Sequence, residues 1–279
     1  MTIMLRRHPD AILAAHLMDR SRKELYVEGT RDRLFLAWLL GQRLHPNALI
    51  REIASVELPG RPGGERGRIC HFAELLGGVS VRIRMFADAD WDRVLRRSVP
   101  SRVWLTDKRD LEGYVLREEC LDKVLSLGLN TEKITASKIL KAVRQHGRRL
   151  GATRLMSETE LLDLPFQKTD VAKYLTVDAT GVLLDFQGFL RALLQNAGVR
   201  LVRLGELQNR VDVVEASYAK IPDDQMIHGK DAVAIIAVAL SKFALDQKEI
   251  TRLLWTSFEC GFVEPGSVLE TVVAFLQEP

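Results

Sequence analysis

Hydrophobic and polar residues in the first part of the chain alternate with the periods of strands and helices. Leu25, Tyr26 and Val27 form a short run of strand-forming residues, and the apolar residues of segment 31–43 then recur at helical spacing. Segment 79–85 has the strict period of two that is typical of a strand. We therefore expect strands at residues 24–27, 48–58, 79–85 and 101–106, and helices at residues 10–20, 31–43 and 67–76.

This alternation predicts an α/β fold with a mainly parallel sheet flanked by helices, because right-handed crossovers join successive parallel strands. After residue 111 helical patterns dominate. We expect a short strand at 199–204 and helices at 111–127, 137–150, 182–197, 206–220, 230–245, 249–260 and 268–276. The predicted organisation is a first part of the core at residues 1–118, a helical insertion at 119–198 and a return to the core at 199–279.

Residues 60–68 are rich in Gly and Pro and are therefore expected to form a loop. Its arginines, Arg61, Arg66 and Arg68, lie on backbone that can approach phosphate groups. The loop does not match a P-loop, because no Gly-Lys-Ser/Thr sequence follows and Glu65 would repel a phosphate.

The composition indicates a globular protein with a full core. Of the 279 residues 47% are hydrophobic, and 40 Lys and Arg against 37 Asp and Glu give a net charge of +3. This balance neither requires nor excludes a nucleic-acid partner. Cys70, Cys120 and Cys260 lie far apart, which argues for a reducing compartment and against both a disulfide framework and a zinc ribbon.

The amino-terminal apolar stretch is interrupted by polar residues, and no run of about 20 apolar residues occurs in the chain. We therefore expect a soluble, cytoplasmic protein with no signal peptide and no membrane span.

Acidic residues follow two of the predicted strands. Glu28 comes directly after Val27, with Asp32 near the start of the next helix, and Asp88 and Asp90 follow the strand at 79–85. The carboxyl edge of an open α/β sheet is where ligands bind. In an extended segment Asp88 and Asp90 point to the same side, with Cα atoms about 6.5–7 Å apart.

Two such carboxylates repel each other, and a divalent cation removes that repulsion. Oxygen ligands suit Mg²⁺ or Mn²⁺ rather than zinc. Together with Glu28 from a neighbouring strand, the set is sufficient to hold one or two metal ions against phosphate oxygens. The pattern also admits a structural interpretation, in which Asp88, Asp90 and Asp92 close a strand and cap a helix starting at Trp91, and Asp32 stabilises the start of its own helix.

The order of the two acidic strand ends resembles that of the TOPRIM domain, the topoisomerase/primase fold. VEGTRD and, some 60 residues later, FADAD are similar to the Glu-Gly and Asp-x-Asp motifs that follow the first and third strands of this family. On this resemblance Glu28 corresponds to the catalytic glutamate, and Asp88 and Asp90 correspond to the metal-binding pair. Asp32 is similar to the second acid of the EGxxD form found in OLD-type nucleases.

Two later segments extend the resemblance. VWLTDKRDLEGYVL, residues 103–116, resembles a stretch of a TOPRIM nuclease subgroup that includes the effector subunit of the PARIS anti-phage system. There the acid that matches Glu112, with Asp110 nearby, joins the metal site. HGKD, residues 228–231, is similar to a later family element, and we expect Lys230 to stabilise negative charge developing on the phosphate. The helical lobe has no match in the family.

The resemblance implies a Mg²⁺- or Mn²⁺-dependent nuclease that cleaves DNA or RNA, tRNA included, and that acts as a defence effector controlled by a partner ATPase. The expected catalytic residues are Glu28, Asp88, Asp90 and Lys230, and the expected metal ligands are Glu28, Asp32, Asp88, Asp90 and Glu112. Glu28 can serve either as a ligand or as the general base. The expected partners are nucleic acid, the ATPase and a second copy of the chain.

Basic residues of the loop, of the segment after the Asp-x-Asp motif and of one predicted helix are candidates for contacts with a phosphate backbone. They are Arg61, Arg66, Arg68, Arg93, Arg96, Lys141, Arg144 and Arg148. A basic helix is more often a solvated face.

Two other functions remain open. One is a non-catalytic interaction subunit that keeps the TOPRIM scaffold and uses its apolar helices after residue 180 for assembly. The other is a phosphatase or phosphotransferase for small molecules, which also uses Asp-x-Asp but leaves the EGxxD strand end unexplained.

Overall fold

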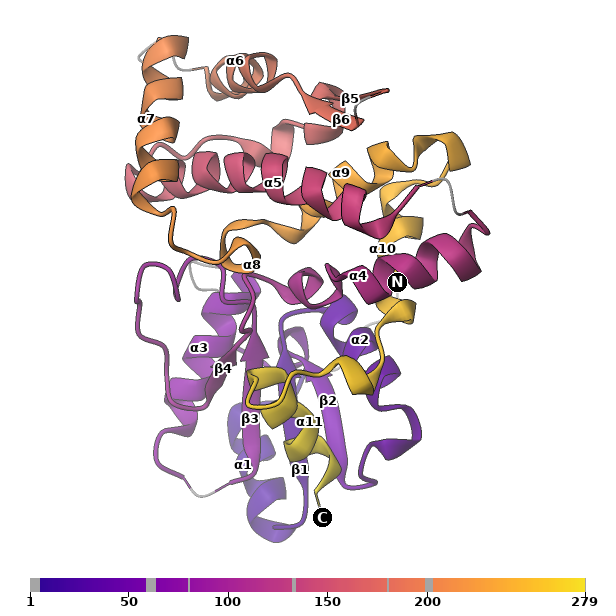
Figure 1. The fold of residues 1–279 in the computed structure, drawn as a ribbon. Helices are drawn as coiled ribbons and strands as arrows, with labels where there is room; N and C mark the ends of the chain where they lie inside the picture. Colours follow the sequence, from indigo (N-terminus) through magenta and orange to yellow (C-terminus); the bar gives the residue numbers. More distant parts are fainter. Residues whose placement is uncertain are drawn as a thin grey trace. The chain divides into compact units, whose positions relative to one another are not determined.

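The chain forms two compact units in the computed structural model, which describes residues 6–58, 64–79, 81–131, 134–179, 181–198 and 203–278. Unit 1 comprises residues 1–107 and 258–279, and unit 2 comprises residues 108–257. The chain thus leaves unit 1 after Asp107 and returns to it at Phe258 (Figure 1). These boundaries differ from the expected helical insertion at 119–198, because the second unit extends through the helices that follow it.

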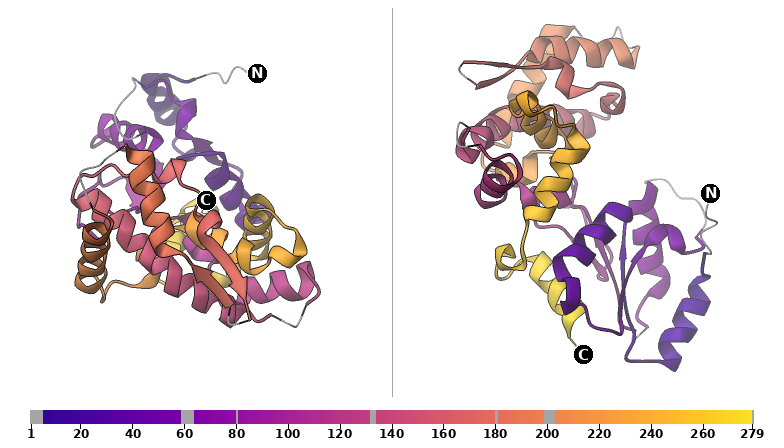
Figure 2. Two further views of the ribbon diagram at one scale, coloured as in Figure 1. Left: turned by 90° about the horizontal axis from the view of Figure 1, so that it is seen from above. Right: turned by 90° about the vertical axis from the view of Figure 1, so that its right-hand side faces the viewer.

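Unit 1 is built on a four-stranded parallel sheet with the order β2-β1-β3-β4. Its strands are β1 (Lys23–Val27), β2 (Ala48–Glu52), β3 (Ile83–Ala87) and β4 (Val103–Leu105). Its helices, which lie on both sides of the sheet (Figure 2), are α1 (Pro9–Met18), α2 (Thr30–Leu40), α3 (Gly64–Leu76) and α11 (Val268–Gln277). The prediction of an α/β fold with a mainly parallel sheet is therefore confirmed.

Aromatic contacts join the helices to the two faces of the sheet. Tyr26 of β1 packs edge to face on Phe72 of α3, with ring centroids 5.0 Å apart. Trp104 of β4 makes the same kind of contact with Phe275 of α11, at 5.5 Å. Because helices cover both faces, every residue of β1 is buried, as is usual for a central parallel strand.

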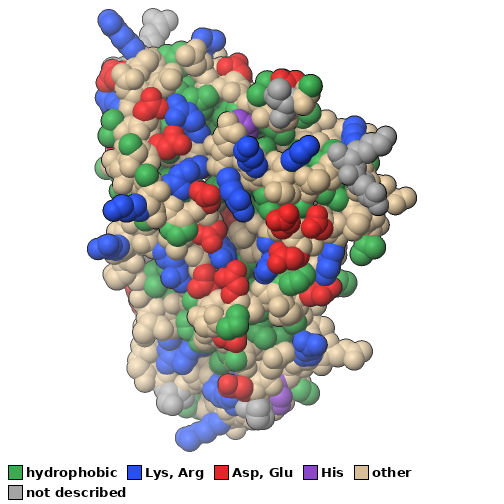
Figure 3. Space-filling model, viewed as in Figure 1, with side chains coloured by type: hydrophobic (Ala, Val, Ile, Leu, Met, Phe, Trp, Pro, Cys, Tyr) green, Lys and Arg blue, Asp and Glu red, His purple; other side chains and the backbone are tan. Residues whose placement is uncertain are grey.

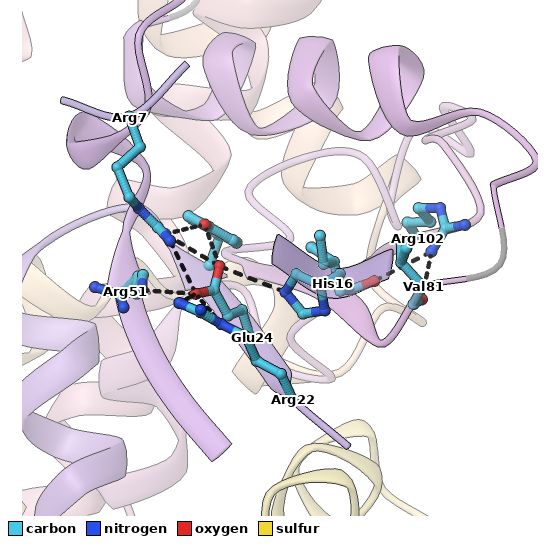
Figure 4. A network of polar contacts seen from close by, with 9 residues as sticks. Arg7, His16, Arg22, Glu24, Arg51, Val81 and Arg102 are labelled. Atoms are coloured by element: carbon cyan, nitrogen blue, oxygen red, sulfur yellow. Dashed lines mark hydrogen bonds and ion pairs between the residues drawn. The ribbon is translucent and has the colours of Figure 1, made fainter. Parts of the chain in front are cut away.

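The amino end of β1 buries two charged side chains, Lys23 and Glu24. Lys23 Nζ donates to the backbone oxygens of Phe275 and Glu278, at 3.0 and 2.5 Å. The Glu24 carboxylate accepts hydrogen bonds of 2.5–3.1 Å from Tyr26, Arg7, Arg22 and Arg51. Figure 4 shows the three arginines around it.

The polar contacts of Glu24 decide its charge. Burial acts to raise the pKa of Glu24, but the contacts with His16, Arg7 and Tyr26 outweigh burial and hold that pKa well below its usual range. Glu24 is therefore ionised, and its negative charge is shared among several cations.

Unit 2 is mainly helical. It contains α4 (Glu118–Lys123), α5 (Ala136–Thr159), α6 (Phe186–Ala197), α7 (Leu204–Ser217), α8 (Asp223–Met226), α9 (Gly229–Ala239) and α10 (Gln247–Ser257). An antiparallel hairpin of β5 (Leu175–Asp178) and β6 (Gly181–Leu184) precedes α6. Helix α5, with 24 residues, packs against α7 and α9 and forms the centre of the unit.

Two glycines of α5 permit a close approach of the segment before α9. A Cβ atom at Gly151 would overlap the Met226 carbonyl oxygen, and one at Gly147 would lie 2.8 Å from Cγ2 of Ile227. The four-residue spacing places both glycines on one face of the helix. At this face the missing Cβ atoms make room for the Met226 backbone and the Ile227 side chain.

Short 3-10 turns complete the chain at Gly41–Arg43, Ile53–Ser55, Leu111–Val115, Phe166–Lys168, Val171–Tyr174, Ser241–Phe243 and Cys260–Phe262, with a π-helical turn at Val124–Gly128. None of the helices in the described ranges is long and apolar enough to cross a membrane.

Several predicted elements are wrong in extent or type. The helix predicted at 182–197 begins with strand β6, because Asp185 caps α6 by accepting the Gly188 N–H at 2.9 Å. The helix predicted at 111–127 is broken into a 3-10 turn, α4 and a π-helical turn. The strand predicted at 48–58 ends at Glu52.

The segments near residues 91 and 204 also differ from expectation. The helix at Trp91 that formed part of the structural interpretation of the acidic residues is absent; turns replace it, in which the Asp92 N–H donates to the Ala89 carbonyl at 2.9 Å. Of the strand predicted at 199–204, residues 199–202 lie outside the described ranges, and Leu204 begins α7 instead.

Candidate acidic site at the carboxyl ends of β1 and β3

The carboxyl ends of β1 and β3 bring two predicted site residues together. The strands are parallel neighbours in which Val27 pairs with Phe86, so Glu28 follows one strand beside the end of the other. The Asp88 backbone N–H donates to Oε1 of Glu28 at 3.1 Å. Acids 60 positions apart in the chain therefore meet at this edge of unit 1.

The environment of Glu28 favours its protonated form. Burial raises the pKa of Glu28 to about 7, and the negative charge of Asp90 adds to the rise. Arg66 and the Asp88 N–H act against this rise, and Asp32 adds to it. Glu28 therefore gains or loses a proton near neutral pH. This property suits a general base, and it also suits a metal ligand that must lose its proton.

Asp90 does not lie in the extended segment that was predicted. Its φ is +46°, in the left-handed region that residues other than glycine seldom adopt, and the chain turns here. The flanking residues Ala89 and Trp91 are buried, whereas Asp90 is exposed. The expectation that Asp88 and Asp90 project from one side of an extended strand is thus wrong, because the turn intervenes.

Asp32 has a structural role at the start of α2. Its Oδ2 accepts the Gly29 N–H at 2.9 Å, which caps the helix. This is the structural alternative that the sequence left open for Asp32. Its charge nevertheless acts on Glu28, so Asp32 belongs to the same electrostatic neighbourhood.

Arg66 is a cation within this acidic neighbourhood, as is Arg97, whose Nη1 lies 3.8 Å from Oδ1 of Asp92. Its guanidinium donates to the Asp88 carbonyl and to the Asp92 carboxylate, and Nη1 lies 3.8 Å from Oε1 of Glu28. Burial acts to lower the pKa of Arg66, but the charge of Asp92, followed by those of Asp90 and Glu28, outweighs burial and raises it.

Arg66 was expected on a flexible loop in contact with nucleic acid, which is wrong for its position because α3 already begins at Gly64. The first turn of a helix that crosses a parallel sheet lies at the carboxyl edge of that sheet. An earlier predicted start for this helix would have placed Arg66 beside Glu28.

The residues of the edge match the chemistry of a divalent cation only in part. Carboxylate oxygens are the ligands that Mg²⁺ and Mn²⁺ prefer. The raised pKa of Glu28 is due first to burial and then to the negative charge of Asp90, which Arg66 opposes. Within the described ranges, however, no three or more His, Cys, Asp or Glu side chains are gathered as a metal-binding group. The carboxylate oxygens and the negative charge of this edge fit a divalent cation, but the described residues do not assemble a complete set of ligands.

Unit 2 contains the two other predicted acids, Asp110 and Glu112. Asp110 is buried, and its carboxylate accepts the N–H groups of Gly229 at 2.6 Å and Gly113 at 3.2 Å. Burial, together with the charge of Glu112, raises the pKa of Asp110. A Cβ atom at Gly229 would overlap the Glu112 side chain, so both acids lie against the first turn of α9.

Lys230 follows Gly229 in this turn and is exposed. Of the other ionisable residues in the HGKD motif, Asp231 is in an ion pair and His228 is neutral. Asp231 forms a buried, two-bond ion pair with Arg154, at 2.7 and 2.7 Å. Burial lowers the pKa of His228 to about 3, so that its ring is neutral. Lys230 is therefore the exposed cation of the motif.

Three of the arginines expected to bind nucleic acid form intramolecular contacts instead. Arg68 donates to the Val56 and Leu58 carbonyls at 2.7 and 3.3 Å, and Arg93 donates to the Thr106 and Leu105 carbonyls at 2.6 and 2.8 Å. Arg148 donates to Tyr218, Ile221 and Asp223 at 2.7–2.9 Å. These arginines therefore hold loops in place, and their contacts with nucleic acid stay a prediction.

The other predicted contacts are placed differently. Arg96, Lys141 and Arg144 are exposed, and Arg61 lies outside the described residues. On the face drawn in Figure 3, basic and acidic side chains are interspersed.

No model of a known protein family matches the chain, and a search of curated proteins finds no match. The resemblance to the TOPRIM family therefore remains a prediction from the motifs.

Proposed function

We propose that the chain is a Mg²⁺- or Mn²⁺-dependent nuclease of the TOPRIM type that cleaves phosphodiester bonds in DNA or RNA. The observation that supports this proposal is the contact between Asp88 and the Glu28 carboxylate, which joins the two acidic strand ends named by the motifs. We also propose that the chain is the toxic effector of an anti-phage system and is held inactive by a partner ATPase; this part rests on the motif resemblance.

Glu28, Asp88 and Asp90 would hold the metal ion. When bound, the ion supplies a Lewis acid for the scissile phosphate and lowers the pKa of the attacking water. A pKa near 7 allows Glu28 to accept a proton at neutral pH without a large energetic cost. Arg66 holds part of the acidic cluster in place while no substrate is present.

The motif resemblance adds three residues of unit 2 to the proposal: Lys230, Asp110 and Glu112. Asp110 fixes the first turn of α9 through its bond to the Gly229 N–H, and this turn presents Lys230. A lysine so placed stabilises negative charge on a phosphate group in the transition state. Asp110 is a positioning residue in this scheme.

A second candidate function is that of a non-catalytic interaction subunit with the same scaffold. Leu34 and Trp38 of α2 are 52% and 59% exposed and lie four residues apart, so they share one face of the helix. Such a face favours contact with another protein.

A cleavage assay separates the two functions. Purified protein is incubated with labelled DNA, RNA and tRNA in Mg²⁺, in Mn²⁺ or in EDTA, alone and after activation by release from co-purified partners. The nuclease proposal expects metal-dependent cleavage that falls at least a hundredfold in Glu28→Gln. Glu57→Gln, which alters an exposed acid elsewhere in unit 1, should cleave as the parent does. Cleavage that survives in Glu28→Gln, or is absent in every activated form, contradicts the proposal.

A further inference from the structure

A cavity of about 600 Å³ lies in unit 1 at the edge of the sheet opposite the acidic site. Arg82 precedes β3 and Arg84 is its second residue, whereas Asp88 follows the end of this strand. With a rise of about 3.3 Å per residue, the two edges are roughly 15 Å apart. The cavity is lined by His16, Leu17, Arg20, Val81, Arg82, Arg84, Phe275 and Glu278.

Positive charge dominates this cavity. Of its described lining residues, three are arginines, Arg20, Arg82 and Arg84, and one is an acid, Glu278. The nearest buried acid, Glu24, is already hydrogen-bonded to three other arginines, as Figure 4 shows. Among the described lining residues, arginines therefore outnumber acids.

The basic residues around the cavity repel one another. Burial lowers the pKa of Arg102, and the charge of Arg84 lowers it further. Burial likewise lowers the pKa of Lys23, with the charge of Arg82 as the second cause. An anion bound among these residues would relieve this repulsion.

Aromatic rings hold one arginine of the cavity in position. The Arg84 guanidinium lies over the Trp104 ring, 5.8 Å from its centroid, and Nη1 donates to the Ile83 carbonyl at 3.0 Å. Trp104 is in turn packed on Phe275, which lines the cavity. The cavity thus combines a pre-positioned guanidinium with the apolar surface of Phe275, Leu17 and Val81.

We propose that this cavity binds a nucleotide through its phosphate group, taken either from a free nucleotide or from a nucleic-acid strand. Guanidinium groups form paired hydrogen bonds with phosphate oxygens, which favours phosphate over other anions. The volume lies within the range of small-molecule sites, and the apolar surface can accommodate a base. This site is separate from the proposed metal site and does not depend on nuclease activity.

The test is isothermal titration in EDTA at about 50 mM salt, so that neither metal nor screening interferes. AMP, adenosine and a 5′-phosphorylated adenine hexanucleotide are titrated into the parent and into Glu28→Gln. We expect saturable binding of at least one phosphorylated probe, equal in both proteins and at least tenfold tighter than adenosine. Arg82→Gln and Arg84→Gln should each weaken it about tenfold, the effect of one lost charge-assisted hydrogen bond.

Two further variants control for folding and for general loss of charge. Arg20→Gln alters an exposed side chain of the cavity and should also weaken binding, whereas Arg43→Gln alters an exposed arginine elsewhere in unit 1 and should not. Tighter binding of AMP than of the hexanucleotide identifies a free nucleotide as the ligand, and the reverse identifies a strand. Absence of phosphate-dependent binding, or binding that is the same in Arg20→Gln, Arg82→Gln and the parent, overturns the proposal.

Discussion

The backbone N–H of Asp88 is hydrogen-bonded to the carboxylate of Glu28, at 3.1 Å. The bond joins the residues that follow two adjacent parallel strands. It keeps the Glu28 side chain at the carboxyl edge of the sheet, where burial and the charge of Asp90 raise its pKa to about 7. The acidic edge therefore carries repulsion that protons or cations relieve.

This raised pKa predicts how stability depends on pH. The folded protein holds a proton on Glu28 up to about pH 7, whereas the unfolded chain releases it near the ordinary value of 4.5. The folded state thus binds more protons between these values, so stability falls as pH rises through this window, by about 1–3 kcal/mol from Glu28 alone.

Thermal unfolding between pH 4.5 and 8 checks this prediction. Glu28→Gln should lose this part of the pH dependence and exceed the parent in stability at pH 8. Asp110 also has a raised pKa, so Asp110→Asn serves as the comparison for the contribution of unit 2. A parent and a Glu28→Gln variant with the same pH profile would show that residue 28 is not protonated in the folded protein.

Arg66 is predicted to compete with a divalent cation for the acidic edge. It contacts Asp92 and lies 3.8 Å from Glu28, so its removal takes one positive charge out of the acidic cluster, while Arg97 Nη1 stays 3.8 Å from Oδ1 of Asp92. Arg66→Gln should lose about 1–3 kcal/mol of stability in EDTA. In the same variant Mn²⁺ should bind roughly tenfold more tightly, because one nearby positive charge is gone. Mn²⁺ binding that weakens in Arg66→Gln would mean that Arg66 assembles the metal site.

Lys230 is predicted to act on the transition state rather than on substrate binding. Lys230→Ala should lower kcat of nucleic-acid cleavage by about 10²–10³ with little change in KM. Lys220→Ala, which alters another exposed lysine of unit 2, should leave both constants unchanged. Loss that appears only in KM would make Lys230 a binding residue.

Gly151 is predicted to be indispensable for the packing of unit 2. An alanine there would overlap the Met226 carbonyl, so Gly151→Ala should cost about 1–3 kcal/mol or more. Gly205→Ala, in α7, meets no atom within 4 Å and should be neutral or slightly stabilising. Unfolding in urea measures both, and equal stabilities of the two variants would contradict the close approach at α5.

The sequence was sufficient for the strand ends but not for the contacts around them. Glu28 was located by the strand-forming residues before Gly29, and Asp88 was located by the alternating pattern before it. The two residues were expected to lie together because parallel strands end at a common edge of the sheet. The turn at Asp90 depends on burial of Ala89 and Trp91, which a period of two does not reveal.

The sequence also does not predict which groups contact the buried polar residues or which strands pair. From the sequence, Lys23 and Glu24 are polar residues at the start of a strand and would be expected to be exposed. Both are buried, because Lys23 donates to carbonyl groups and Glu24 accepts from arginines of distant segments. The run at 182–184 fits a helix or a strand equally well, and pairing with β5 decides it. Such outcomes depend on tertiary contacts rather than on local pattern.

The most direct test of the acidic site is Mn²⁺ titration followed by thermal unfolding of the parent, Glu28→Gln, Asp88→Asn and the control Glu57→Gln. Binding to the folded state alone stabilises a protein by about 2.7 kcal/mol at a hundred times the dissociation constant. We predict a saturable rise in Tm for the parent and Glu57→Gln that is lost in Glu28→Gln and Asp88→Asn. A rise of equal size in all four proteins, or none in the parent, would contradict a shared cation between the two strand ends.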